Sequence, residues 1–167
     1  RNALAVQLYP ASGRYEINAM SWDWTTETRE RLQDFLRARA LMDGPPEIAA
    51  IGDGHSNLTY LLRHGDKAMV LRRPPPPPLA PGSNDVLREA RLLRALEPTG
   101  APVPRVLASG ESGELFDVPF YIMAHVPGIV VTNDMPEALS DADTVCDIGF
   151  AMVDALANLH KVDWRAA

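Results

Sequence analysis

Five consecutive prolines, Pro74 to Pro78, are the feature that most restricts how this chain can fold. Proline fixes φ and lacks a backbone N–H, so a proline run cannot join a β-ladder and favours extended polyproline II structure. The apolar segment KAMVLRR ends immediately before the run, and VLREARLLRALE follows it with the apolar spacing of a helix. The sequence therefore predicts a strand over residues 67–73, a semi-rigid arm, and a separate helix over residues 86–97.

Short apolar segments on both sides of this arm predict one antiparallel sheet. EIAAIG, LTYLLRH and KAMVLRR, within residues 47–73, are joined by DGHSN and by HGDK, where Gly65 permits a positive φ. Beyond the helix, RVLASGE at 105–111 and FYIMAHV at 120–126 predict two further strands. Three strands, a helix and two strands indicate an α+β fold with an antiparallel sheet of about five strands.

Two amphipathic segments predict helices that flank this sheet. In TETRERLQDFLRARALM, capped by Thr25 or Thr26, one face carries Leu32, Phe35, Leu36 and Ala40. SDADTVCDIGFAMVDALANLHKVDW begins at a possible Ser140 cap and has apolar residues at helical intervals: Val145, Ile148, Met152, Leu156 and Leu159. We expect Cys146, within the second segment, to be a small core residue. Residues 1–24 show no lasting period, and we assign them no role.

Composition and charge limit the classes of partner. With 167 residues, 46% of them hydrophobic, the chain can form one core or two small ones. A net charge of −6 disfavours binding to nucleic acid, which needs a surplus of Lys and Arg on one surface. Cys146 is the only cysteine, and no apolar stretch is long enough for a bilayer, so we expect a cytoplasmic protein. The start at Arg1 rather than Met suggests a fragment, and no secretory leader follows it.

Two features suggest a site for phosphate groups. The loop GDGHSN, from Gly52 to Asn57, would leave backbone N–H groups free to approach phosphate oxygens, although a plain hairpin turn has the same composition. Arg72, at the end of the third strand, would place a cation beneath those phosphates if Glu89 on the following helix held it. Alternatively, Arg72 and Arg73 are edge charges that discourage strand aggregation, and Glu89 lies on a solvated helix face.

The order of these segments resembles the aminoglycoside phosphotransferase family, which has the protein-kinase fold. GDGHSNLTYLL is similar to its phosphate loop and flanking strands, and MVLRR to the strand that carries the nucleotide-anchoring cation. DVLREARLLRAL followed by APVPRVL is similar to its helix C and the next strand, and PFYIMAHVPG to the strand that leads into the hinge. The resemblance runs from about Ile48 to Trp164 and implies an N-terminal lobe of the kinase type, with a packed helix C.

The resemblance also implies roles for individual residues. Arg72 would contact the nucleotide phosphates where most of the family has lysine, and Glu89 would be the helix C glutamate that orients it. Met123 would be the gatekeeper, or a core methionine, and the backbone of Ala124 and Val126 would pair with adenine. The full set of implied nucleotide-binding residues is Gly52, Gly54, His55, Ser56, Asn57, Arg72, Glu89, Met123, Ala124 and Val126.

The catalytic part of the family pattern does not follow Trp164. No His-Gly-Asp loop, later Asn or metal-binding Asp is present, so we predict no catalytic residue and no metal ligand in this chain, histidines included. The resemblance implies an N-terminal segment at 1–24, a kinase-like lobe at 25–126, and a hinge with the first helices of an incomplete lobe at 127–167.

The function that we expect is the ATP-binding lobe of a phosphotransferase acting on a small-molecule hydroxyl, with Mg²⁺ bound by the complete enzyme and not by this chain. This chain alone is predicted to be inactive. The alternative is a non-catalytic nucleotide-binding or interaction module that associates through the surface on which a C-terminal lobe would pack, or that self-associates.

Overall fold

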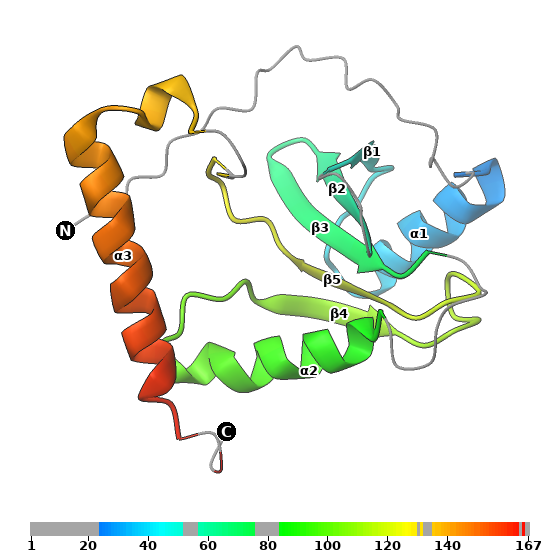
Figure 1. Ribbon diagram of the computed structural model, residues 1–167. Helices are drawn as coiled ribbons and strands as arrows, with labels where there is room; N and C mark the ends of the chain where they lie inside the picture. Colours follow the sequence, from blue (N-terminus) through cyan, green and yellow to red (C-terminus); the bar gives the residue numbers. More distant parts are fainter. Residues whose placement is uncertain are drawn as a thin grey trace. The chain divides into compact units, whose positions relative to one another are not determined.

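The computed structural model describes residues 24–51, 57–75, 84–129, 131, 135–163 and 165 (Figure 1). These residues form two compact units. The larger unit takes its described residues from Arg14–Arg94 and Pro104–His125, and the smaller unit from Ala95–Val103 and Val126–Ala167. Of the five prolines only Pro74 and Pro75 are described, so the predicted arm lies almost wholly outside the described residues.

The larger unit is built on a five-stranded sheet with the strand order β1-β2-β3-β5-β4 (Figure 1). All neighbouring strands are antiparallel, which confirms the predicted sheet and the α+β class. The predicted bounds of β2 and β3 are correct, whereas β1 ends two residues before the predicted Gly52. The elements are α1 (Thr26–Ala38), β1 (Glu47–Ala50), β2 (Leu58–His64), β3 (Lys67–Arg73), α2 (Val86–Leu96), β4 (Val106–Gly110) and β5 (Phe120–Ala124).

Alternating side chains give the sheet two apolar faces. One face packs against α1 and contains Tyr60 and Leu62 from β2, together with Phe120 and Ile122 from β5. The other face packs against α2, where Tyr121 contacts Val86 and Ala90 and has Met123 beside it. Because successive strand residues point to opposite faces, neighbouring residues of β3 and β5 serve different helices. The sheet therefore lies between α1 and α2.

Helix α1 begins as predicted and ends earlier than predicted. The Thr25 side chain accepts a hydrogen bond from the Thr28 amide at 3.1 Å, and the expected residues Leu32, Phe35 and Leu36 are buried. The helix ends at Ala38, because Ala40 takes a φ of 55° and the Leu41 amide donates to the Leu36 carbonyl at 3.0 Å. This is a Schellman termination. The prediction that Ala40 extends the buried face was wrong, since the residue is exposed.

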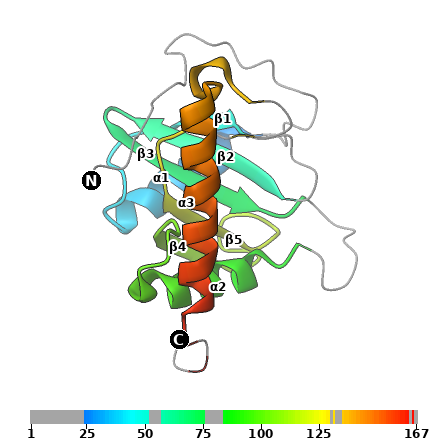
Figure 2. The ribbon, with the colours of Figure 1, turned by 60° about the vertical axis from the view of Figure 1, so that its left-hand side comes forward.

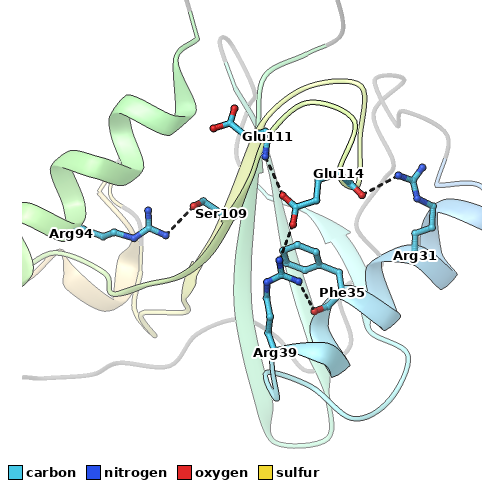
Figure 3. A network of polar contacts seen from close by, with 7 residues as sticks. All are labelled: Arg31, Phe35, Arg39, Arg94, Ser109, Glu111 and Glu114. Atoms are coloured by element: carbon cyan, nitrogen blue, oxygen red, sulfur yellow. Dashed lines mark hydrogen bonds and ion pairs between the residues drawn. The ribbon is translucent and has the colours of Figure 1, made fainter.

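Glu114, in the loop between β4 and β5, accepts hydrogen bonds from two arginines at α1 and its C-terminal end (Figure 3). The Arg39 guanidinium donates to Glu114 Oε1 at 2.7 Å and also lies 3.5 Å from the centre of the Phe35 ring. Arg31, about two helical turns before Arg39, donates to the Glu114 carbonyl at 3.0 Å. These contacts fix the orientation of α1, while its apolar face supplies most of the attachment.

Helix α2 is capped by Asp85, which the sequence offers as a cap together with Ser83 and Asn84. Its carboxylate accepts from the Arg88 amide at 2.8 Å, and the Glu89 amide donates to the Asp85 carbonyl at 3.2 Å. Near the other end of α2, Arg94 donates to Ser109 Oγ on β4 at 3.0 Å (Figure 3). Glu89 is thus in the first turn of a helix that is fixed to the sheet.

The smaller unit contains the long helix α3 (Ala142–His160), which is continuous along its length (Figure 2). Its cap is Asp141, which accepts from the Thr144 amide at 2.9 Å, and not the predicted Ser140, whose hydroxyl donates to the Glu137 carbonyl. No residue of α3 is buried, so the expectation that Cys146 lies in a core was wrong: its side chain is exposed. Among the described residues, no helix combines the length and apolar character that a membrane span requires.

Candidate functional site

The central feature of the site is an ion pair between β3 and α2. Arg72 Nε lies 3.1 Å from Glu89 Oε2, the pairing that the family resemblance implied. The two side chains are 29% and 37% exposed, so the pair is partly shielded from water. Arg72 Nε is itself buried and is not aligned for a hydrogen bond. The ion pair engages Nε, and the two terminal nitrogens of a guanidinium carry four further N–H donors.

Strand alternation separates Arg72 from its neighbour Arg73. Arg72 points to the α2 face with Glu89, whereas Arg73 lies on the α1 face, 4.6 Å from the centre of the Phe116 ring and 5.9 Å from that of Tyr60. Arg73 is only 7% exposed. The sequence-based alternative, in which both arginines are solvated edge charges, does not describe this arrangement.

Tyr121 is a residue of the site that the sequence reading missed. It is the direct partner of Arg72 in the β3–β5 ladder and is only 1% exposed. The pKa of its phenol is raised well above the usual value, first by burial and then by the negative charge of Glu89, while Arg72 acts in the opposite direction. The pairing register of β3 and β5 could have placed Tyr121 beside Arg72, but no sequence motif marks it.

Asn57 is the one residue of the predicted phosphate loop that the structure describes. Its Oδ1 accepts a hydrogen bond from Asn84 Nδ2 at 3.0 Å, and Asn84 immediately precedes the cap of α2 with a φ of 62°. An asparagine tolerates this left-handed backbone better than most residues. The contact joins the start of β2 to the start of α2. Gly52, Gly54, His55 and Ser56 lie outside the described residues.

The predicted adenine-binding residues follow the end of β5. Met123 is partly buried and packs on the α2 face, so it belongs to the core of that face, as either interpretation of this residue required. The Ala124 amide donates to the Arg105 carbonyl at 2.8 Å, which extends the pairing of β4 and β5. The next residue, His125, has a lowered pKa because of burial and the nearby charge of Arg63. Val126 belongs to the smaller unit and is 66% exposed.

The described residues offer no metal centre. Within the described ranges, no group of three or more His, Cys, Asp or Glu side chains is close enough to hold an ion.

Several longer proteins resemble this chain. The mouse protein acyl-CoA dehydrogenase family member 10 is 36% identical over 123 residues, which are 74% of this chain and 11% of that protein. Human acyl-CoA dehydrogenase family member 11 is 34% identical over 116 residues, 70% of this chain and 15% of the relative. This chain therefore spans only a small part of the length of the relatives it matches.

A solved structure shows the same architecture. A candidate aminoglycoside phosphotransferase from Ralstonia eutropha superposes with a TM-score of 0.63 and 29% sequence identity, over 82% of this chain and 39% of that one. The sequence also matches the phosphotransferase enzyme family over residues 47–167. Since that match covers most of the chain, and the sheet with its packed helix reproduces the kinase-like N-terminal lobe, this chain belongs to the phosphotransferase enzyme family.

Proposed function

We propose that this chain binds ATP and forms the nucleotide-binding lobe of a phosphotransferase that transfers the γ-phosphate to a hydroxyl group of a small molecule. The observation that supports it most directly is the Arg72–Glu89 pair, which joins β3 to α2 at 3.1 Å. An arginine held by a carboxylate can still offer its remaining donors to phosphate oxygens. Family membership adds independent support.

Each residue of the site would have a separate task in binding. Arg72 would neutralise the α- and β-phosphates, and Glu89 would keep the guanidinium in place. The amide group of Asn57, whose oxygen is already bonded to Asn84, would donate to a phosphate oxygen. The carbonyl of Ala124 and the amide of Val126 would recognise adenine through the backbone. Gly52, Gly54, His55 and Ser56 would complete the phosphate loop.

Magnesium would reach this site with the nucleotide. A bound Mg²⁺ would offset the negative charge of the phosphates during transfer. Because the described residues contain no group of three or more His, Cys, Asp or Glu side chains that could hold an ion, we assign no metal ligand among them.

Substitution of Arg72 tests the nucleotide site. Calorimetry of the full-length protein with MgATP should show binding that Arg72→Ala weakens about tenfold, because a charge-assisted contact is lost. Arg72→Lys should bind nearly as well as the natural protein, since lysine is the common residue of the family. Arg94→Ala is the matched control: this exposed arginine of α2 bonds to Ser109 and should leave affinity unchanged. Equal affinity of Arg72→Ala and the natural protein would remove Arg72 from the site.

Phosphate transfer needs a separate assay with a panel of hydroxyl acceptors. The relatives are named for acyl-CoA chemistry, so a hydroxyacyl-CoA is the first compound to test, beside an aminoglycoside and a simple sugar alcohol. Acceptor-dependent release of ADP would establish a kinase. Binding of ATP without any transfer would leave the nucleotide site in place and refute the catalytic part of the proposal.

One observation favours the non-catalytic alternative, a module that self-associates. Helix α3 exposes large apolar side chains, and those of Val145, Met152 and Leu159 recur every seven residues with exposed fractions of 39%, 69% and 41%. This spacing aligns side chains on one stripe and suits pairing with the same helix of a second copy. Light scattering should then detect dimers that Met152→Glu dissociates. A monomer at high protein concentration would exclude this candidate.

A further inference from the structure

The side chain of Tyr121, on β5, lies beside the Arg72–Glu89 pair that joins β3 to α2. Tyr121 on β5 is the direct antiparallel partner of Arg72 on β3, and direct partners project to the same face of a sheet. The ring of Tyr121 packs against Val86 and Ala90 of α2, on either side of Glu89 in the sequence. The phenol is therefore fixed beneath the helix turn that carries the carboxylate.

These contacts place the phenol of Tyr121 close to the Glu89 side chain, whose negative charge acts on it. An ionised carboxylate can only accept, so in a hydrogen bond between the two groups the phenol would be the donor. A phenol of ordinary pKa is protonated at physiological pH and can donate, and burial and the negative charge of Glu89 raise its pKa further.

A rigid hydrogen-bond partner would lower the entropy cost of ordering this partly exposed ion pair. Arg72 and Glu89 both have long, flexible side chains, and partly exposed pairs of this kind are weak on average because ordering them costs entropy. Tyr121 is 1% exposed and has only two side-chain torsions, both restricted by packing. A hydrogen bond from this ring restricts the Glu89 carboxylate to positions close to Arg72.

We propose that Tyr121 is a positioning residue of the nucleotide site, which donates a hydrogen bond to Glu89 and so holds that carboxylate against Arg72. The inference rests on the proposed function, because Arg72 is assigned there to the nucleotide phosphates. Tyr121 itself does not contact the nucleotide in this arrangement. It acts on phosphate binding only through Glu89.

Tyr121→Phe tests this role, because it removes the hydroxyl and keeps the ring. In the ligand-free, full-length protein, the ¹⁵N NMR signal of Arg72 Nε should shift and its N–H should exchange faster with water, as it should in Glu89→Gln. Affinity for MgATP, measured by calorimetry, should fall about three- to tenfold. In a Glu89→Gln background, Tyr121→Phe should change affinity less than twofold, because the group through which it acts has been altered.

Tyr60→Phe is the matched control. Tyr60 is also buried, at 3% exposure, but its ring lies on the α1 face and its hydroxyl has no hydrogen-bond partner within the described part of the chain. This variant should leave both the Arg72 signal and the ATP affinity unchanged. It separates the loss of one specific hydrogen bond from the general effect of removing a buried hydroxyl.

The two measurements separate failure of this inference from failure of the proposed function. An unchanged Arg72 signal in Tyr121→Phe overturns the positioning role, whatever the protein binds. A shifted signal with undiminished ATP affinity, or a full additional loss in the Glu89→Gln background, overturns it as well. If the natural protein fails to bind ATP, the proposed function is refuted, and the NMR result alone decides whether Tyr121 holds the pair.

Discussion

Replacing Arg73 by methionine should leave the free energy of unfolding nearly unchanged or raise it. Arg73 is 7% exposed, and no hydrogen bond or ion pair to it is found among the residues that the structure describes. Among the described residues, its guanidinium lies 4.6 Å from the centre of the Phe116 ring and 5.9 Å from that of the Tyr60 ring. Trp24 packs edge-on against both rings. The cation therefore lies beside a cluster of aromatic rings, with its Nε atom buried and without a hydrogen-bond partner within the described residues.

Two opposing terms set the expected size of the effect. Burial of an unpaired charge costs several kcal/mol, and two cation–π contacts return about 2–4 kcal/mol. Methionine keeps the length and apolar contacts of the arginine stem without the charge. We expect Arg73→Met to change the free energy of unfolding by less than about 1 kcal/mol, or to raise it by up to about 2 kcal/mol. Arg73→Ala leaves a cavity and should cost about 2–4 kcal/mol.

Urea denaturation followed by circular dichroism can compare the two variants with the natural protein. Equal slopes of the unfolding free energy against urea concentration would show that each variant unfolds from a similarly compact state. MgATP affinity should be unchanged in Arg73→Met, in contrast to Arg72→Ala. If Arg73→Met were as destabilised as Arg73→Ala, the positive charge itself would be required, and the argument from an unpaired buried cation would be refuted.

Two further predictions concern polar contacts outside the site. Glu114→Gln removes the charge of the Glu114–Arg39 pair, whose side chains are about 40% exposed, and should cost less than about 1 kcal/mol in urea unfolding, with even less effect in 1 M salt. A loss as large as that of Leu36→Ala, which empties a fully buried site, would contradict this. The pKa of Asp141 is lowered from 3.8 by its hydrogen bonds with Thr144, so its capping contribution is complete above about pH 3.8 and is lost as the pH falls through the lower, folded value. The helical circular dichroism signal should therefore fall more steeply at acidic pH in the natural protein than in Asp141→Asn, and identical pH profiles would contradict the assignment.

The sheet could be predicted from the sequence because its signals are local. LTYLLRH and KAMVLRR are bounded by a turn at Gly65 and by Pro74, so both strands were assigned with their correct ends. The bounds of α2 are set by the Asp85 cap and by Pro98, which are equally local. The prediction that Arg72 pairs with Glu89 depended on the resemblance to a family, because the spacing of the two residues alone did not indicate it.

The remaining features depend on contacts between distant segments or on competing local choices. Tyr121 joins the site through the register of β3 and β5, which brings together residues 49 positions apart; hydrophobic patterning does not reveal its partner. Helix α1 ends at Ala38 because the amides of Ala40 and Leu41 donate to carbonyls of its last turn. These bonds end the helix although the helical periodicity of apolar residues continues to Ala40. Asp141 rather than Ser140 caps α3 because the Ser140 hydroxyl is bonded to Glu137.

The neighbouring arginines of β3 show how one strand can keep stability and ligand binding separate. Their side chains point to opposite faces, so the cation that meets a carboxylate belongs to the α2 face, and the cation among aromatic rings belongs to the α1 face. Substitutions on the α1 face should then change the free energy of unfolding with little effect on nucleotide affinity. Substitutions at Arg72, Glu89 or the Tyr121 hydroxyl should do the reverse, because partly exposed polar contacts contribute little to stability and much to the placement of charge. A one-residue shift of β3 would exchange the faces to which Arg72 and Arg73 point. The register between β2 and β3, which the Gly65 turn sets at one end, is therefore important for both roles.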